Sequence, residues 1–168
     1  MQLQNIDKAR YRSHLNKVIF ACIICLTAGS LGISQTLIVL FPDQDGSHFH
    51  WNLLGVVASA LAIGWLLNKF RTHPFMYEVV YVWDLKQALN RVTRKMPKLK
   101  KAAQQGDVDA MLAMQFSYSG SKQLWELDDN TITLEDLGLW QAELDTLAAK
   151  YQVTLDIQQY DEAILKKF

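Results

Sequence analysis

The chain has 168 residues, half of them hydrophobic, and its 17 basic and 17 acidic side chains give a formal net charge of zero. This length allows about one modest domain beside any membrane segment. Both cysteines, Cys22 and Cys25, lie within one apolar run, which excludes a small secreted domain held together by disulfides.

Residues 1–17 form a polar, basic arm, and an apolar run without acidic or basic side chains follows over residues 18–41. A cleaved signal peptide ending near Ser30 is one interpretation of this run. The run continues well beyond Ser30, however, and a cleaved peptide would not need that continuation. We therefore interpret residues 18–41 as a first transmembrane helix.

A polar turn covers residues 42–50, and a second apolar run follows over residues 51–68. About 20 apolar residues cross roughly 30 Å of hydrocarbon as a helix, so the two runs predict a transmembrane hairpin. Basic residues precede the first run and follow the second at Lys69 and Arg71, whereas the turn has no Lys or Arg. The positive-inside rule then places both termini in the cytoplasm and the turn in the periplasm.

Small residues recur at helical spacing along both predicted spans. Such spacing lets helix backbones approach closely in lipid. The contact is either within the hairpin or between copies of the chain, and the sequence leaves both open. The residues are Ala21, Cys25 and Gly29 in the first span, and Gly55, Ser59 and Ala62 in the second.

Residues 74–168 are predicted to form a small helical cytoplasmic domain. Pro74 suits the first turn of a helix that runs to about Met96, and Pro97 is expected to end it. A second helix is expected from about Asp107, with an interruption at residues 119–121.

Two further helices are expected in this domain. Thr133 is predicted to cap a third helix, and a last helix is expected from about Asp156. No pair of strands with a hairpin signal is present. The predicted fold class is therefore an all-α membrane protein, with a two-helix transmembrane hairpin and a small helical cytoplasmic domain.

A basic run lies near the start of the predicted cytoplasmic domain. It could contact anionic lipid at the membrane surface, or pair with residues 107–162, where twelve acidic side chains stand against two lysines. Nucleic acid is not an expected partner, because the domain as a whole is slightly acidic. The residues of the run are Arg91, Arg94, Lys95, Lys98, Lys100 and Lys101.

Two groups of residues have the composition of a chemical site. Cys22 and Cys25 have the spacing of a redox dithiol, but a reactive thiol needs a stabilised thiolate, which hydrocarbon disfavours. His48 and His50 share the turn with two aspartates at residues 43 and 45, a set that could bind a divalent metal. The simpler interpretations are helix packing and a solvated loop, and no catalytic residue or cofactor is predicted.

The layout resembles a known family. The basic arm Asn5-Ile-Asp-Lys-Ala-Arg-Tyr-Arg12, two spans with a short Asp-containing turn, and about 95 helical residues are similar to small two-span bacterial inner-membrane proteins described only as a domain of unknown function. The resemblance implies the inner membrane of a Gram-negative bacterium. It implies no catalytic residues.

The expected function is that of a membrane-anchored, non-enzymatic interaction or accessory protein of the bacterial inner membrane. Its expected partners are the lipid bilayer and either another protein or a second copy. The spans lack Asp, Glu, Lys and Arg, which transporters and proton relays usually need. The alternatives are a redox or metal-dependent accessory enzyme using Cys22/Cys25 or His48/His50, and a small subunit of a transporter complex.

Overall fold

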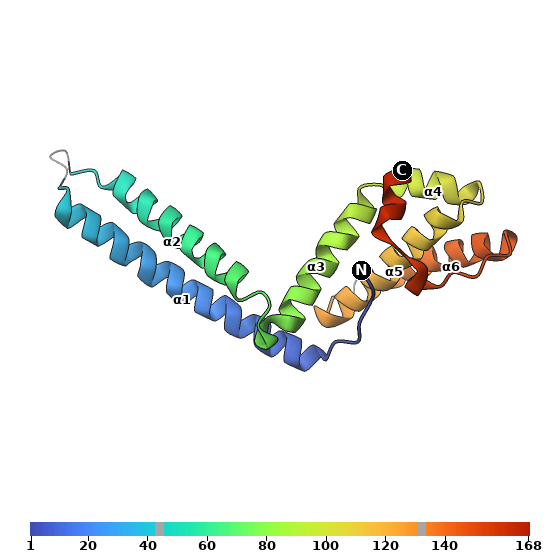
Figure 1. Cartoon of the computed structure of the whole chain (residues 1–168), viewed down its shortest axis with the longest axis horizontal. Helices are drawn as coiled ribbons and strands as arrows, with labels where there is room; N and C mark the ends of the chain where they lie inside the picture. Colours follow the sequence, from blue (N-terminus) through green and yellow to red (C-terminus); the bar gives the residue numbers. More distant parts are fainter. Residues whose placement is uncertain (43–45, 131–133) are drawn as a thin grey trace. The chain divides into compact units, whose positions relative to one another are not determined.

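The computed structural model describes residues 1–42, 46–130 and 134–168, and within them it contains helices and turns but no strand. This confirms the all-helical prediction. The chain divides into two compact units. The first consists of residues Ala9–Val80, and the second combines Met1–Lys8 with Tyr81–Phe168. In the sequence, the boundaries between the units fall at the start of helix α1 (Lys8–Leu40) and within helix α3 (Tyr77–Thr93) (Figure 1).

The first unit is a helical hairpin made of α1 and α2 (Phe49–Lys69), followed by the short 3₁₀ helix η1 (Pro74–Met76). Helix α1 contains most of the first predicted span, residues 18–41, but it begins at Lys8 rather than at residue 18 and ends at Leu40. Residues 8–17 contain no Pro or Gly, so nothing stops the helix from continuing through polar sequence. The predicted basic arm is therefore helical from Lys8.

Helices α1 and α2 lie antiparallel and touch where their side chains are smallest. A Cβ atom added to Gly29 would lie 2.9 Å from Ser59 Oγ, and one added to Gly55 would lie 2.6 Å from the carbonyl oxygen of Ser30. Ser34 is buried beside Gly55 and donates a hydrogen bond to Asn52. Small residues thus let the two backbones approach closely within one hairpin.

The second unit packs helices around α5 (Val108–Leu127), which has buried residues along most of its length. Helices α4 (Met96–Gln104) and α6 (Leu134–Lys150) contact α5, as do the 3₁₀ helices η2 (Ile157–Gln159) and η3 (Glu162–Lys167). The largest fully buried side chains of the unit's core are Phe116, Leu85, Leu99, Met111, Leu144 and Val92.

Residues 1–8 belong to this second unit. The backbone N–H of Gln4 donates to Tyr81 Oη over 2.8 Å, and the Tyr81 hydroxyl donates to Gln123 Oε1 over 2.9 Å. Gln123 in turn donates from Nε2 to the carbonyl oxygen of Gln4. The first residues are thus tied to α3 and α5 by a closed set of hydrogen bonds.

The structure corrects three local predictions in this unit. Pro97 does not end a helix but lies in the first turn of α4, where its missing N–H costs nothing, and α3 ends at Thr93. Helix α5 runs through Gly120 without interruption. A glycine is needed there because a Cβ atom would lie 2.9 Å from Leu89 and 3.2 Å from Leu85. Close packing, not a break, explains this glycine.

The third correction concerns the last residues. The expected C-terminal helix from Asp156 is replaced by η2 and η3, each capped by the aspartate that precedes it. Asp156 accepts from the N–H of Gln158 and Asp161 from the N–H of Ala163. Two such caps five residues apart favour two short turns over one helix. The expected cap at Thr133 lies outside the described residues.

Candidate functional site

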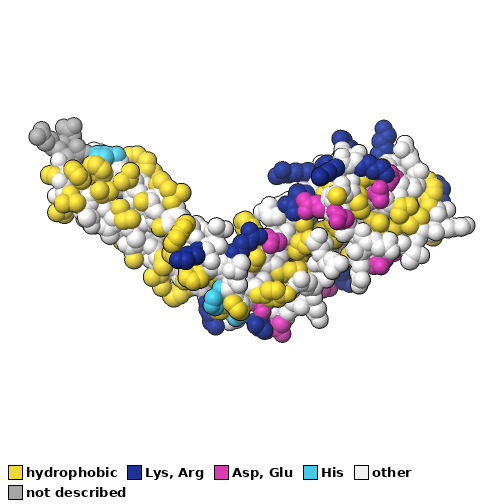
Figure 2. Space-filling model, viewed as in Figure 1, with side chains coloured by type: hydrophobic (Ala, Val, Ile, Leu, Met, Phe, Trp, Pro, Cys, Tyr) yellow, Lys and Arg dark blue, Asp and Glu magenta, His cyan; other side chains and the backbone are white. Residues whose placement is uncertain are grey.

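The six predicted basic residues lie where α3 meets α4. Arg91 is in the last turn of α3, Arg94 follows that helix, and Lys95 is the N-cap residue of α4. The other three lysines of the run lie within α4. Figure 2 shows dark-blue side chains gathered where α3, α4 and the C-terminal segment lie close together.

Three of these side chains bind the C-terminal segment. Arg91 Nη2 donates to Glu162 Oε2 over 3.0 Å, Lys95 Nζ donates to the carbonyl oxygen of Leu165 over 2.5 Å, and Lys98 Nζ to a backbone oxygen of Phe168 over 2.6 Å. Lys100 lies over the Trp140 ring, 5.9 Å from its centre. Among the residues that the structure describes, Arg91–Glu162 is the one pair that joins the basic run to a carboxylate of residues 107–162.

A groove of about 470 Å³ opens at this corner. Arg91, Arg94, Lys95 and Lys166 line it together with Glu162, so cations outnumber carboxylates in its wall. Guanidinium and ammonium groups held this close together suit phosphate or carboxylate oxygens. The groove can therefore hold an anion.

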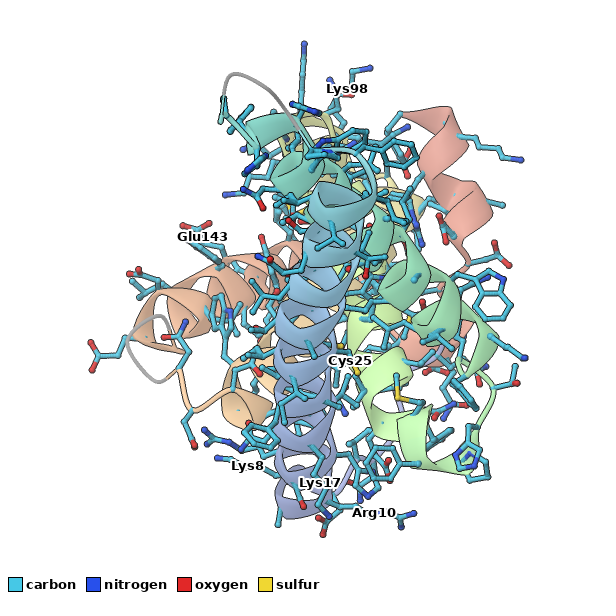
Figure 3. The ribbon with its side chains drawn as sticks, turned by 90° about the vertical axis from the view of Figure 1, so that its left-hand side faces the viewer. Lys8, Arg10, Lys17, Cys25, Lys98 and Glu143 are labelled. Carbon is cyan, nitrogen blue, oxygen red and sulfur yellow. The ribbon has the colours of Figure 1, made fainter. Side chains whose placement is uncertain are left out.

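A second concave site lies within the hairpin unit, a crevice of about 360 Å³ between α1, the end of α2 and η1. Its wall is almost entirely apolar and includes both cysteines. Cys25 is exposed and Cys22 is partly exposed, and both thiols are free. In Figure 3, Arg10 and Lys17 lie toward the beginning of α1 and Cys25 lies farther along it.

The predicted packing residues do not all lie at one contact. Gly29, Gly55 and Ser59 lie between α1 and α2, where Gly55 and Ser59 are buried. Ala21 and Cys25 line the crevice instead, and Ala62 is exposed. Of the six residues, Gly29, Gly55 and Ser59 therefore make the close contact within the hairpin.

The predicted metal site in the turn is only partly described, because residues 43 and 45 lie outside the described residues. His48 Nδ1 is buried without a hydrogen-bond partner, and the His50 ring lies 4.5 Å from the Trp51 ring. Among the described residues, no three His, Cys, Asp or Glu side chains are grouped so that they could hold a metal ion.

Sequence reasoning missed a buried ionic cluster next to the crevice. The side chain of Glu78 is only 5% exposed, and its Oε1 lies 2.8 Å from Arg10 Nε. Its Oε2 lies 3.1 Å from His14 Nδ1, and the His14 ring packs against Phe75 at 4.1 Å between centres. Glu78 is the only acidic residue from Thr72 to Trp83, and this isolated charge is the sequence feature that could have indicated the cluster.

These observations define a class of protein: an all-helical chain with two candidate membrane-spanning helices, Lys8–Leu40 and Phe49–Lys69, which are long and apolar enough to cross a bilayer. Residues 1–165 match a family described as a protein of unknown function, DUF3087, and the chain belongs to that family. No curated protein matches the chain. No solved structure matches it either.

Proposed function

We propose that the chain is a membrane-anchored, non-enzymatic accessory protein of the bacterial inner membrane. The helical hairpin crosses the bilayer, both termini lie in the cytoplasm, and the helical unit of residues 81–168 presents a surface to a partner. The observation that carries this proposal is the exposure of the hairpin. Only 6% of the most apolar window of α1, and 11% of that of α2, is buried within the protein.

This exposure separates a membrane helix from the core helix of a soluble protein, which would be mostly buried. Large apolar side chains on both helices face outward, including Phe20, Val39 and Leu61, which are 66%, 78% and 70% exposed. Such continuous apolar surface is unfavourable in water and suits hydrocarbon. The helical backbone meets the second requirement of a bilayer, because its N–H and C=O groups bond within the helix.

The proposed orientation follows from charge. From residue 8 to residue 80, all Lys and Arg lie before residue 18 or after residue 68, and none lies between the two apolar segments. Basic residues favour the cytoplasmic side of a bacterial membrane. The end of the hairpin that carries Lys17 and Lys69 is therefore the cytoplasmic end.

Two surfaces of the second unit support an interaction role. Leu139 and Trp140 on α6 are 67% and 40% exposed, an apolar patch of the kind that partner proteins cover. The basic groove at Arg94 suits an anionic partner, including acidic lipid at the membrane surface. Either surface would serve an anchored interaction protein.

Membrane fractionation tests the proposal. The full-length chain is expected to sediment with membranes, to remain there after alkaline carbonate washing, and to enter solution only with detergent. Recovery in the soluble fraction without detergent would contradict it. Mild-detergent purification then tests the accessory role: a stoichiometric partner, or a defined homo-oligomer, is expected.

The redox alternative makes a different prediction. If Cys22 and Cys25 performed redox chemistry, replacing both by Ser would abolish the function of the chain. On the accessory proposal the double variant keeps its membrane location, its partner and its cellular phenotype.

A further inference from the structure

We infer that the crevice at the cytoplasmic end of the hairpin is a binding site for an anionic glycerophospholipid, with one acyl chain in the crevice and the head group among the basic residues at its mouth. This inference rests on the proposed function, because the ligand comes from the bilayer. The inference goes beyond the proposed function in assigning one specific lipid site to a helix surface that otherwise contacts bilayer lipids without preference.

The crevice has the size and chemistry of an acyl-chain site. Its volume of about 360 Å³ lies within the range of small-molecule pockets, roughly 300–1,000 Å³. Helix α1 contributes Val18 and Cys22, α2 contributes Ile63 and Leu67, and η1 contributes Phe75. Side chains of this kind offer hydrocarbon contacts over the whole wall and exclude a polar ligand from its interior.

Two lysines next in sequence to residues that line the crevice select the head group. Lys17 and Lys69 are both exposed, and each directly adjoins in sequence a residue that lines the crevice, Val18 and Phe70. Glu78, a described carboxylate of this unit, is buried and bound to Arg10, so it does not neutralise the two lysines. Their ammonium groups favour an anionic head group over a zwitterionic one.

His73 adds a hydrogen-bond donor at the same place. Its Nδ1 accepts a hydrogen bond of 3.2 Å from the backbone N–H of Phe75, which leaves Nε2 as the ring nitrogen that can donate. The ring lines the crevice. Its Nε2–H is suited to a phosphate or ester oxygen of a lipid whose chain lies against Phe75.

Side chains outside the crevice support the wall that contains Phe75. The His14 ring packs on Phe75, and His14 and Arg10 both bind Glu78, which joins the start of α1 to the start of α3. A preformed apolar wall lowers the ordering cost of binding. The open side is bordered by Leu66 and Phe70, which are 40% and 50% exposed, so a chain can enter from the bilayer.

The test uses the full-length protein in nanodiscs of phosphatidylcholine that contain a small fraction of a photoactivatable lipid, either phosphatidylglycerol or phosphatidylcholine. After irradiation, the sites of lipid attachment are mapped by mass spectrometry. Adducts of phosphatidylglycerol are expected to concentrate on the peptides that line the crevice and to exceed those of phosphatidylcholine there. Exposed positions elsewhere on α1, such as Leu31 and Val39, are expected to react equally with both lipids.

Three variants sharpen the test. Replacing Lys17 and Lys69 by Gln is expected to lower the phosphatidylglycerol adducts roughly fivefold for each lysine. Cys25→Trp fills the crevice and is expected to remove adducts of both lipids from it. Ile24→Trp places the same bulk at a neighbouring residue that does not line the crevice, and is expected to change nothing.

Equal labelling by the two lipids, or uniform labelling along both helices, would overturn the inference while leaving membrane insertion intact. A crevice without adducts beside fully labelled outer faces would assign it to a second copy of the chain and would also overturn it. Failure of the protein to enter nanodiscs would overturn the proposed function and this inference together.

Discussion

The carboxylate of Glu78 lies 3.1 Å from the imidazole of His14 across 64 residues of sequence, and the side chain of Glu78 is almost completely buried. Arg10 completes the cluster at 2.8 Å. These contacts tie the start of α3 to the start of α1, next to the crevice. A single buried carboxylate thus fixes the end of the hairpin at which Lys17 and Lys69 lie.

Replacing Glu78 by Gln should destabilise the protein. The amide keeps the shape but loses the charge-assisted bonds to Arg10 and His14 at a buried position, at a cost of about 1–3 kcal/mol. Thermal unfolding in mild detergent measures this cost. Glu126→Gln, at an exposed position on α5, serves as the control and should change little. Equal midpoints for the two variants would contradict the role given to Glu78.

Gly55→Ala tests the packing of the hairpin. The new methyl group would meet the backbone oxygen of Ser30 at 2.6 Å, so the helices must separate, at a cost of about 1–3 kcal/mol. Gly64 lies on the same helix with nothing within 4 Å of an added Cβ. Gly64→Ala should therefore be neutral or stabilising, because Ala favours a helix by about 1 kcal/mol over Gly. Unfolding in detergent compares the two, and a loss for Gly64→Ala as large as that for Gly55→Ala would argue against this contact.

Asp107→Ala tests the cap of the central helix α5. Asp107 Oδ1 accepts from the N–H of Ala110 over 3.1 Å, and its other oxygen lies 2.7 Å from Lys167 Nζ. Loss of such a cap costs about 0.5–2 kcal/mol. Asp109→Ala removes the other partner of Lys167 but leaves the cap, so it should cost less. Chemical unfolding followed by circular dichroism distinguishes the two, and equal losses would mean that the cap contributes nothing.

The same carboxylate gives a pH dependence. Burial alone would raise the pKa of Asp107, but the ammonium of Lys167 and the N–H groups of Ala110 and Asp109 outweigh it, so its pKa lies below the ordinary value of 3.8. A depressed pKa stabilises the folded state above pH 3.8, and this contribution is lost as the pH falls through the folded-state pKa. The difference in stability between wild type and Asp107→Ala should therefore shrink in strong acid.

Tyr160→Phe tests a buried hydroxyl. The Tyr160 ring stacks on Phe116 at 4.1 Å, and its hydroxyl is buried without a hydrogen-bond partner among the described residues. Burial, with help from Glu162, raises the pKa of Tyr160 from 10.0 to about 12. Between those values the unfolded chain releases a proton that the folded chain keeps, so folding weakens as the pH rises.

Removing the hydroxyl should therefore preserve stability at neutral pH, or increase it by up to about 1 kcal/mol, since no hydrogen bond is lost. It should also flatten the loss of stability between pH 10 and pH 12. Melting curves at several pH values measure both effects. A large loss at neutral pH would show that the hydroxyl does have a partner.

The sequence predicted the existence of the helices better than their ends. Apolar composition and 3.6-residue periodicity are properties of whole segments, so α1, α2, α3, α5 and α6 could be anticipated. The ends depend on local and tertiary detail: Pro97 opens α4 because a proline fits the first helical turn as well as it fits a stop. Gly120 resembled a break because the leucines that require it come from another helix.

The candidate sites show the same difference between what a segment's composition predicts and what depends on tertiary packing. The basic residues from Arg91 to Lys101 were visible as a run, but their partners Glu162 and Leu165 lie about 70 residues away and come close only through packing around α5. In the sequence, Glu78 stands out only as the single acidic residue between Thr72 and Trp83. Its partners on α1, Arg10 and His14, could not be predicted because their proximity to Glu78 depends on how the chain folds after α2.

Labelling of single cysteines in intact spheroplasts tests the central claim of a membrane hairpin most directly. In a chain with Cys22 and Cys25 replaced by Ser, Ser47→Cys lies in the turn and Thr72→Cys lies after α2. A membrane-impermeant maleimide applied to spheroplasts should label Ser47→Cys at once, and Thr72→Cys only after the membrane is permeabilised. Labelling of Thr72→Cys alone in intact spheroplasts, or equal protection of both sites in a protein recovered without detergent, would contradict the account.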